Sequence, residues 1–231
     1  MSDKPTVIVF ALFPGVTQLD FTGPHQVLSR LPGAQVLLAS RTGDPIEVDG
    51  IVFGGLHRLA DIDRCDIICV PGGFGTTDNA IVDAEFLRQV RRLADGARYV
   101  TSVCTGSLVL GAAGLLRGKR AACHWAWRDL LSAFGATPDA GRVVRDGNVI
   151  TGGGVTAGID FALTVVAELA GAYVAQAIQL GIEYAPAPPF NAGSPDTAPP
   201  EILARASGRY AAGAEQRRAA VEAAAARLIR A

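Results

Sequence analysis

Short apolar runs alternate with amphipathic stretches along this chain, and that alternation limits its fold to a narrow class. The apolar runs are rich in β-branched and aromatic residues, which is typical of strands buried on both faces. Strands that alternate with helices predict an α/β fold, in which helices cover both faces of a mostly parallel sheet. The buried strands are expected at residues 6–12, 35–40, 66–70 and 98–103.

The stretches between these strands carry helix signals at their ends. Thr22-Gly23-Pro24 places proline in the first turn of a helix that is expected to run to about Leu31. Asp83 is expected to cap a helix that buries one apolar face and ends at Gly96. Further helices are expected at residues 125–134, from the glycines at 152–154 to 169, and from about 173. Residues 142–150 carry a hairpin signature, and residues 46–53 form either a hairpin or an edge excursion.

The end of the chain differs in composition from the rest. Residues 185–200 are rich in Pro, Ala and Gly and are expected to form an irregular segment on the surface. Residues 201–231 are rich in Ala and Arg and are expected to form a helical extension. The 231 residues are 49% hydrophobic and show no internal repeat, so residues 1–231 are predicted to form a single domain.

Charge and hydropathy exclude several classes of partner. The formal net charge is −1, so no basic excess favours nucleic acid or an anionic membrane surface. No apolar stretch approaches the roughly 20 residues that a membrane-spanning helix needs. The first residues lack the pattern of a secretory signal, and four cysteines in a chain of this length favour a reducing compartment. We expect a cytoplasmic protein.

The cysteines and histidines do not have the spacing of a metal site. Cys65 and Cys69 are separated by three residues, which is too long for a two-residue zinc knuckle. Cys123 and His124 are adjacent, and neighbouring residues of a strand point to opposite faces. We therefore expect no metal ligands.

Cys104 stands where a strand passes into a helix. A cysteine at such a corner lies on a tight turn beside the positive end of the helix, where the pKa of a thiol is lowered and a nucleophile is presented. The other interpretation is a small buried apolar residue, which is the common role of a free cysteine. The segment taken alone leaves both interpretations open.

The expected topology brings other polar groups towards Cys104. Loops that follow successive parallel strands meet at the carboxyl edge of the sheet, where ligands bind in such folds. Asp20, on the loop after the first strand, and the amides of Gly72 and Gly73, after the strand at 66–70, should lie at that edge. This convergence favours a functional role for Cys104 and predicts a nucleophile elbow.

Asp20 is the preferred proton-transfer partner. A carboxyl beside a thiolate at a half-buried edge has its pKa raised, so it can act as an acid and then as a base. The alternative is that Asp20 caps the helix at Phe21, although Thr22 could do so equally well. Thr105 offers a hydroxyl directly after the nucleophile, for orientation of Asp20, water or substrate, or for bonding at the helix start. His124 is the one histidine expected near the site, where a structural hydrogen bond is as well supported as catalysis.

Several motifs together resemble a known superfamily. Residues 103–106 (VCTG), 115–120 (LLRGKR) and 124–125 (HW) resemble the ThiJ/PfpI superfamily, whose fold is flavodoxin-like. Residues 18–24 (QLDFTGP), 152–160 (GGGVTAGID) and 183–191 (EYAPAPPFN) are similar to its isocyanide hydratase branch. Asp20 stands where the glyoxalase and stress-protein branches carry Glu, which leaves room for a small linear substrate. Thr105 stands where the protease-like branch carries His.

The resemblance implies a cofactor-independent hydro-lyase that converts an isocyanide, R–N≡C, into an N-substituted formamide. Cys104 would attack the terminal carbon, and Asp20 would supply the proton and later activate water. The resemblance also implies a homodimer. The amides of Gly73 and Thr105 are candidates to stabilise charge. Trp125 and Val155 would line an apolar pocket for R, although core packing explains both equally well.

Two alternatives belong to other functional classes. Amidotransferase-like sensor domains of AraC-type regulators share the Cys-Thr-Gly elbow, but they continue into helix-turn-helix repeats, and this sequence ends at Ala231 without them. A redox-responsive protein in which Cys104 is oxidised is the other, because an activated, exposed thiolate oxidises most readily.

Overall fold

The computed structural model describes residues 4–230, so residues 1–3 and 231 of the expected 1–231 domain lie outside the described part. Its centre is a seven-stranded sheet in the order β10-β11-β7-β6-β1-β2-β5. All neighbours in this sheet are parallel except β10, which pairs antiparallel with β11. The strands of the sheet are β1 (Thr6–Leu12), β2 (Ala34–Ser40), β5 (His57–Arg58), β6 (Ile67–Val70), β7 (Tyr99–Val103), β10 (Val143–Asp146) and β11 (Val149–Gly152). The mostly parallel sheet confirms the predicted fold class.

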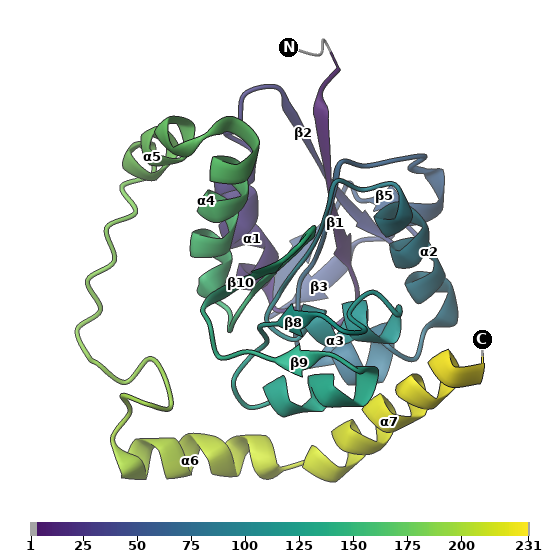
Figure 1. Cartoon of the computed structure of the whole chain (residues 1–231), viewed down its shortest axis with the longest axis vertical. Helices are drawn as coiled ribbons and strands as arrows, with labels where there is room; N and C mark the ends of the chain where they lie inside the picture. The colour runs from purple at the N-terminus through teal and green to yellow at the C-terminus, as the bar shows by residue number, and fades with distance from the viewer. Residues whose placement is uncertain (1–3, 231) are drawn as a thin grey trace.

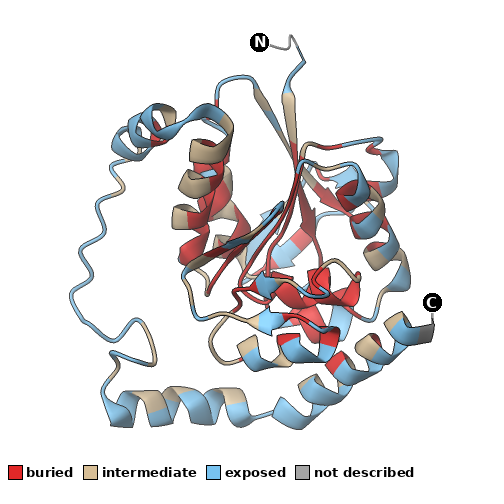
Figure 2. Cartoon of the chain, viewed as in Figure 1, coloured by how far each residue is buried: buried red, intermediate tan, exposed pale blue. Residues whose placement is uncertain are grey.

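Helices lie on both sides of the sheet, with α1 and α4 packed together on one side and α2 and α3 on the other (Figure 1). The central strands β1, β6, β7 and β11 are buried along most of their length, whereas α5 and the end of the chain are largely exposed (Figure 2). No helix within residues 4–230 is long and apolar enough to cross a membrane. The helices are α1 (Gln18–Leu28), α2 (Ala84–Asp95), α3 (Gly106–Ala112), α4 (Ala157–Ala170), α5 (Ala172–Gly181), α6 (Pro200–Ala211) and α7 (Ala214–Arg230).

Short elements complete the fold. The hairpin expected at 142–150 is confirmed as β10–β11, and residues 46–53 form the antiparallel pair β3 (Ile46–Val48) and β4 (Ile51–Phe53). A second small sheet joins β8 (Arg120–Ala121) to β9 (Thr137–Pro138). Two 3-10 helices (Leu59–Asp61 and Arg128–Phe134) and one π-helical turn (Thr76–Ala80) lie in the connections.

The first helix begins earlier than its proline indicates. Helix α1 starts at Gln18 rather than Thr22, and Pro24 lies inside it. A proline lacks the N–H that would bond the carbonyl four residues earlier, which here is the carbonyl of Asp20. The expectation that Asp20 lies on a loop is therefore wrong, because Asp20 belongs to the first turn of α1. The N-cap residue of this helix is Thr17, which makes no side-chain cap bond. Asp20 and Thr22 lie inside the helix, so neither of them caps it.

Two other helix boundaries also differ from expectation. The helix predicted at 125–134 is the 3-10 helix Arg128–Phe134, and the helix expected from Gly152 begins at Ala157. Gly152 instead ends β11, and the carbonyls of Gly152 and Gly153 accept hydrogen bonds from the Cys104 amide. These glycines are thus part of the wall behind Cys104.

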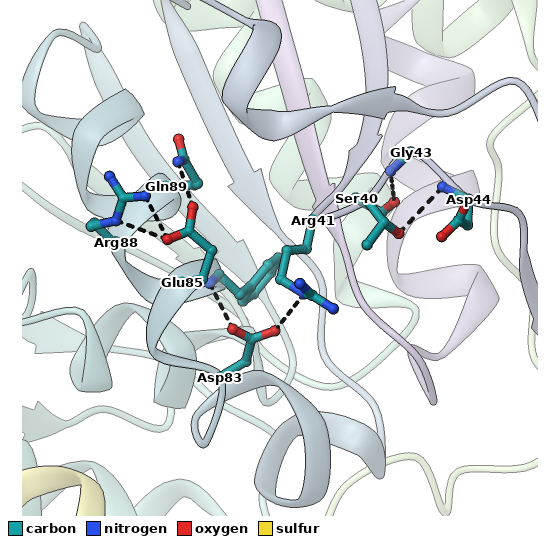
Figure 3. A network of polar contacts seen from close by, with 10 residues as sticks. Ser40, Arg41, Gly43, Asp44, Asp83, Glu85, Arg88 and Gln89 are labelled. Carbon is teal, nitrogen blue, oxygen red and sulfur yellow. Dashed lines mark hydrogen bonds and ion pairs between the residues drawn. The ribbon is translucent and has the colours of Figure 1, made fainter.

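The predicted cap at Asp83 is confirmed and forms part of a polar network between β2 and α2 (Figure 3). Asp83 Oδ1 accepts from the Phe86 amide at 3.0 Å, and Asp83 Oδ2 pairs with Arg41 Nε at 2.9 Å. Arg41 directly follows β2, so this ion pair fixes the end of that strand against the first turn of α2. The pair is partly exposed and lies away from the carboxyl ends of β6 and β7, so it concerns the packing of α2 on the sheet.

The end of the chain forms an arm around the body. Residues 185–199, between α5 and α6, contain no helix or strand, and Figure 1 shows them passing beside the body before α6 begins. Helix α7 then returns to contact α3 and the 3-10 helix Arg128–Phe134. Val221 and Ala224 of α7 are buried, which anchors this last helix.

Candidate active site

Three neighbouring strands carry the candidate site at their carboxyl ends. Cys104 follows β7, Gly72 and Gly73 follow β6 after one residue, and the segment after β1 leads into α1 and Asp20. Cys104 has φ 59°, a left-handed conformation that non-glycine residues seldom adopt. Its amide donates to the Gly152 and Gly153 carbonyls at 3.1 and 2.8 Å. These bonds from β11 hold the strained turn in place.

Asp20 is fully buried at this edge. Its Oδ2 accepts a hydrogen bond from the Gly72 amide at 2.9 Å, whereas Oδ1 has no partner within hydrogen-bonding geometry in residues 4–230. Burial raises the pKa of Asp20 to about 7, against the opposing effects of the neighbouring Cys104 thiol and the Gly72 amide. A carboxyl with this pKa exchanges a proton readily near neutral pH.

The thiol of Cys104 is also buried, with 4% of the residue exposed. Burial, the charge of Asp20 and the nearby Cys123 raise the pKa of Cys104 well above its ordinary value, and the amides of Val155 and Thr105 oppose this. The expectation of a lowered thiol pKa at the helix start is therefore wrong, because burial outweighs the helix end. Burial thus opposes the charged form of both the Cys104 thiol and the neighbouring Asp20 carboxyl.

Thr105 is bonded to the glycine loop and has no hydrogen bond to Asp20. Its Oγ1 accepts from the Gly73 amide at 2.9 Å and lies 2.8 Å from Oγ1 of the buried Thr76. Thr105 Oγ1 also lies within donating distance of the Gly73 carbonyl, at 3.2 Å. Thr105 therefore fixes the loop after β6 against the elbow, and the Gly73 amide is engaged by this hydroxyl.

The absence of a side chain at Gly72 allows three groups of the site to meet. A Cβ atom at Gly72 would lie 2.4 Å from Thr105 N, 2.5 Å from Thr105 Oγ1 and 3.0 Å from Asp20 Oδ2. The first of these is backbone, which has no rotamer to change. The sequence predicted that Gly72 contributes its backbone amide to the site. The structure shows a second requirement, which is that residue 72 has no side chain.

Replacing Gly72 with alanine is expected to displace Asp20 from the elbow and to reduce turnover by about 100-fold or more, since a misplacement near 1 Å has that effect on catalysis. The free energy of unfolding should fall by about 1–3 kcal/mol because of overpacking. Gly96→Ala is the matched control, because Gly96 is exposed and nothing lies within 4 Å of a Cβ there. Chemical denaturation and steady-state kinetics measure both effects; equal activity of the two variants would contradict this assignment.

His124, Trp125 and Val155 lie on one side of the elbow. The Val155 amide contacts the Cys104 sulfur, and the His124 ring packs against Gly154. Burial lowers the pKa of His124, and its Nδ1 accepts from the Ala126 amide at 3.3 Å, so the ring is neutral near pH 7. Trp125 lies next to His124, with ring centroids 5.6 Å apart. The structure thus brings Asp20, Gly72, Gly73, Cys104 and Thr105 together and places His124, Trp125 and Val155 on an adjoining wall.

A cavity of about 350 Å³ lies beyond this wall. It is bounded by the loop of His124 and Trp125, by the turn at residues 153–157 that contacts the Cys104 sulfur, and by residues 193–196 of the irregular segment. Its lining includes Arg128, so the pocket is more polar than the apolar one expected for R. Cavity and thiol share the turn at residues 153–155.

Four contributors to this region are not predicted from the sequence. Thr76 follows the glycine-rich loop after β6, and only this position in the sequence indicates that it lies near the site. Arg128 was assigned to the middle of a helix, and the Pro-rich segment was expected merely to cover the surface. Tyr210 of α6 packs against His124 with the two rings tilted, its hydroxyl lies 3.5 Å from Nε2, and no local pattern indicates that contact.

The described residues contain no metal cluster. No group of three or more His, Cys, Asp or Glu side chains within residues 4–230 is arranged to hold a metal ion. The four cysteines are free and buried.

Known proteins share both sequence and fold with this chain. The DJ-1/PfpI family model matches residues 6–168. An isonitrile hydratase from Pseudomonas putida is 53% identical over 222 residues, which cover 96% of this chain and 97% of that protein. The crystal structure of a ThiJ/PfpI family protein from Pseudomonas syringae has a TM-score of 0.90 and 41% identity, with 96% of this chain and 90% of that chain covered. Drosophila melanogaster DJ-1beta has a TM-score of 0.69 and 25% identity, with 78% and 98% covered.

Proposed function

The chain belongs to the DJ-1/PfpI family, and we propose that Cys104 and Asp20 are the catalytic pair of its isocyanide-hydrating activity. The activity is the addition of water to R–N≡C, which gives an N-substituted formamide. Its support is the 53% identity to an isonitrile hydratase over nearly the whole of both chains. The observation that supports the pair is the buried Asp20 carboxyl, with a pKa of about 7, beside the strained Cys104 elbow.

The first half of the reaction forms a covalent thioimidate. Asp20, as a carboxylate, accepts the proton of the Cys104 thiol as the sulfur attacks the terminal carbon of the isocyanide. The protonated Asp20 then gives this proton to the same carbon, so R–N≡C and Cys–SH become R–N=CH–S–Cys. The raised pKa of Asp20 suits both transfers, because a group whose pKa is near 7 both accepts and donates a proton readily at neutral pH.

The second half releases the product. The Asp20 carboxylate removes a proton from water as the oxygen adds to the thioimidate carbon, and Asp20 then gives this proton to the nitrogen, which returns Asp20 to its carboxylate form. The adduct R–NH–CH(OH)–S–Cys then loses the thiolate to give R–NH–CHO, and the proton of the hydroxyl returns to the sulfur through Asp20. The amides of Thr105 and Val155, which face the sulfur, stabilise its charge in both halves. The Gly73 amide acts by holding Thr105.

Incubation of the purified chain with an aryl isocyanide, with chromatography of the formamide formed, tests this activity directly. We expect steady formation of one formamide per isocyanide consumed, without an added cofactor or metal. Formamide formation at the uncatalysed rate would contradict the proposed function.

The two alternative functions have weaker support. The Cys104 thiol is buried and its pKa is raised, whereas thiols that respond to oxidants are exposed thiolates. A regulator is not favoured either, because the 53% identity extends over 97% of a hydratase. Hydration of an isocyanide is therefore the function with the strongest support.

We also propose that the chain forms a homodimer through α5 and the segment after it. Tyr173 and Leu180 of α5 are 87% and 82% exposed, and Phe190 is 79% exposed. Tyr173 and Leu180 line one groove on α5, and a shared exposed apolar surface of this kind is typical of an interface. Light scattering should give twice the mass of one chain for the wild type and a shift towards one chain for Leu180→Glu. A monomeric wild type at micromolar concentration would contradict the dimer.

We propose that the protein acts in the cytoplasm, because its four free, buried cysteines are consistent with a reducing compartment. Its proposed partner is a small-molecule substrate. Nucleic acid and membranes are not among the proposed partners.

A further inference from the structure

The cavity beside the elbow contains a positive charge that the proposed mechanism does not use. Arg128, at the start of the 3-10 helix Arg128–Phe134, is half-buried and lines this cavity. Within residues 4–230 it takes part in no ion pair and no hydrogen bond. A half-buried guanidinium without a partner is uncommon, because its five N–H donors are left to solvent or to a ligand.

The other charges around the cavity do not neutralise Arg128. Arg142 also lines it, but its Nε donates to Asp160 Oδ2 at 2.6 Å, and that carboxylate accepts from Tyr184 as well. Asp196, on the irregular segment, is the one carboxylate among the lining residues, and it is exposed. The half-buried side of the cavity is therefore positive, and a negative charge faces it from the rim.

The turn at residues 153–155 lies between the cavity and the reacting sulfur and contacts both. Val155 supplies the amide that contacts Cys104 Sγ, and residues 153–155 form part of the cavity lining. The cavity is therefore next to the site, and we take the R group of an isocyanide bound at the sulfur to extend past this turn into it. The volume of about 350 Å³ is within the range of small-molecule sites and can accept a ring-sized group.

We propose that this chain prefers isocyanides whose R group carries a carboxylate, and that Arg128 binds that carboxylate. This inference rests on the proposed function, since it names the substrate class of the same site. Guanidinium recognises carboxylate through two parallel N–H···O bonds, which a lysine or an amide does not reproduce. Arg128 acts in binding, away from the reacting atoms, so its effect belongs mainly in KM.

The test compares 4-isocyanobenzoate with the neutral, equally sized 4-isocyanobenzamide. We expect the wild type to have the higher kcat/KM for the benzoate. In Arg128→Gln the ratio of the two kcat/KM values should fall about 10- to 100-fold, which corresponds to the loss of one charge-assisted hydrogen-bonded pair. In Asp196→Asn the ratio should rise, because a repulsive carboxylate is removed from the rim. Arg128→Lys should retain part of the preference and guards against misfolding of the glutamine variant.

Arg218→Gln is the matched control, since Arg218 is an exposed arginine on α7 that does not line this cavity, and its ratio should equal that of the wild type. An unchanged ratio in a folded Arg128→Gln variant, or a wild type that does not prefer the benzoate, would overturn the inference and leave the hydratase proposal intact. A wild type that hydrates neither compound would overturn both.

Discussion

Replacing Cys104 with alanine is expected to reduce formamide production by about 10³-fold or more, because the reaction then has no nucleophile for its covalent step. The fold should persist, since the hydrogen bonds from the backbone amide of residue 104 to the Gly152 and Gly153 carbonyls do not involve the side chain. Chromatographic rates at saturating isocyanide and circular dichroism measure the two properties on the same sample.

Cys65→Ala is the matched control for this variant. Cys65 is also a buried, free thiol, but its sulfur faces the carbonyl of Leu93, away from the elbow. We expect this control to lose some stability and to keep its activity. A Cys104→Ala variant that turns over at the wild-type rate would show that the sulfur does not react.

Replacing Asp20 with asparagine is expected to reduce kcat/KM by about 10²–10⁴-fold, the range of a lost acid–base group. The reactive form of the wild type has Asp20 as a carboxylate, so its kcat/KM should fall as the pH drops below about 7, where Asp20 takes up a proton. This acidic limb belongs to the coupled Asp20–Cys104 pair. It should be absent from the residual activity of Asp20→Asn.

The Asp20→Asn variant should have a larger free energy of unfolding than the wild type at alkaline pH. The folded-state pKa of Asp20 is raised from 3.8 to about 7, so between these values the folded chain holds a proton that the unfolded chain has released. The wild type therefore loses stability relative to Asp20→Asn as the pH rises from about 4 to 7. Above pH 7 the difference reaches at most about 4 kcal/mol, from the size of the shift.

Denaturation of both proteins at pH 4.5 and pH 8 measures this effect. Asp83→Asn is the control, because Asp83 is a cap on α2 away from the elbow and asparagine caps equally well. It should keep both activity and the wild-type pH profile. An Asp20→Asn variant that keeps the acidic limb, or a stability difference independent of pH, would contradict the role assigned to Asp20.

Much of the fold and of the candidate site could be predicted because the relevant signals are local. The β-branched runs predicted β1, β2, β6 and β7. The change from a strand pattern to a helix pattern at Cys104 predicted a turn at that residue. A parallel sheet then brings its carboxyl ends together, which placed Asp20 and the Gly72 and Gly73 amides near the thiol. These steps need only periodicity and topology.

The remaining features depend on tertiary packing. Proline favours the first turn of a helix, so the pattern placed the helix start at Thr22, yet packing extends α1 back to Gln18 around Pro24. The direction of the Cys104 pKa shift depends on how deeply the sulfur is buried, which no local pattern shows. Arg128 and Asp196 line one cavity only because a segment without periodicity folds back on the body.

Intact-mass spectrometry under single-turnover conditions tests the central claim most directly. The protein in excess is mixed with an aryl isocyanide, quenched in acid within the first turnover and analysed beside Cys104→Ala. We expect a mass increase equal to one isocyanide, located by proteolysis to the peptide that contains Cys104 and absent from the variant. Formamide formation without this adduct, at an equal rate in Cys104→Ala, would contradict covalent hydration through Cys104.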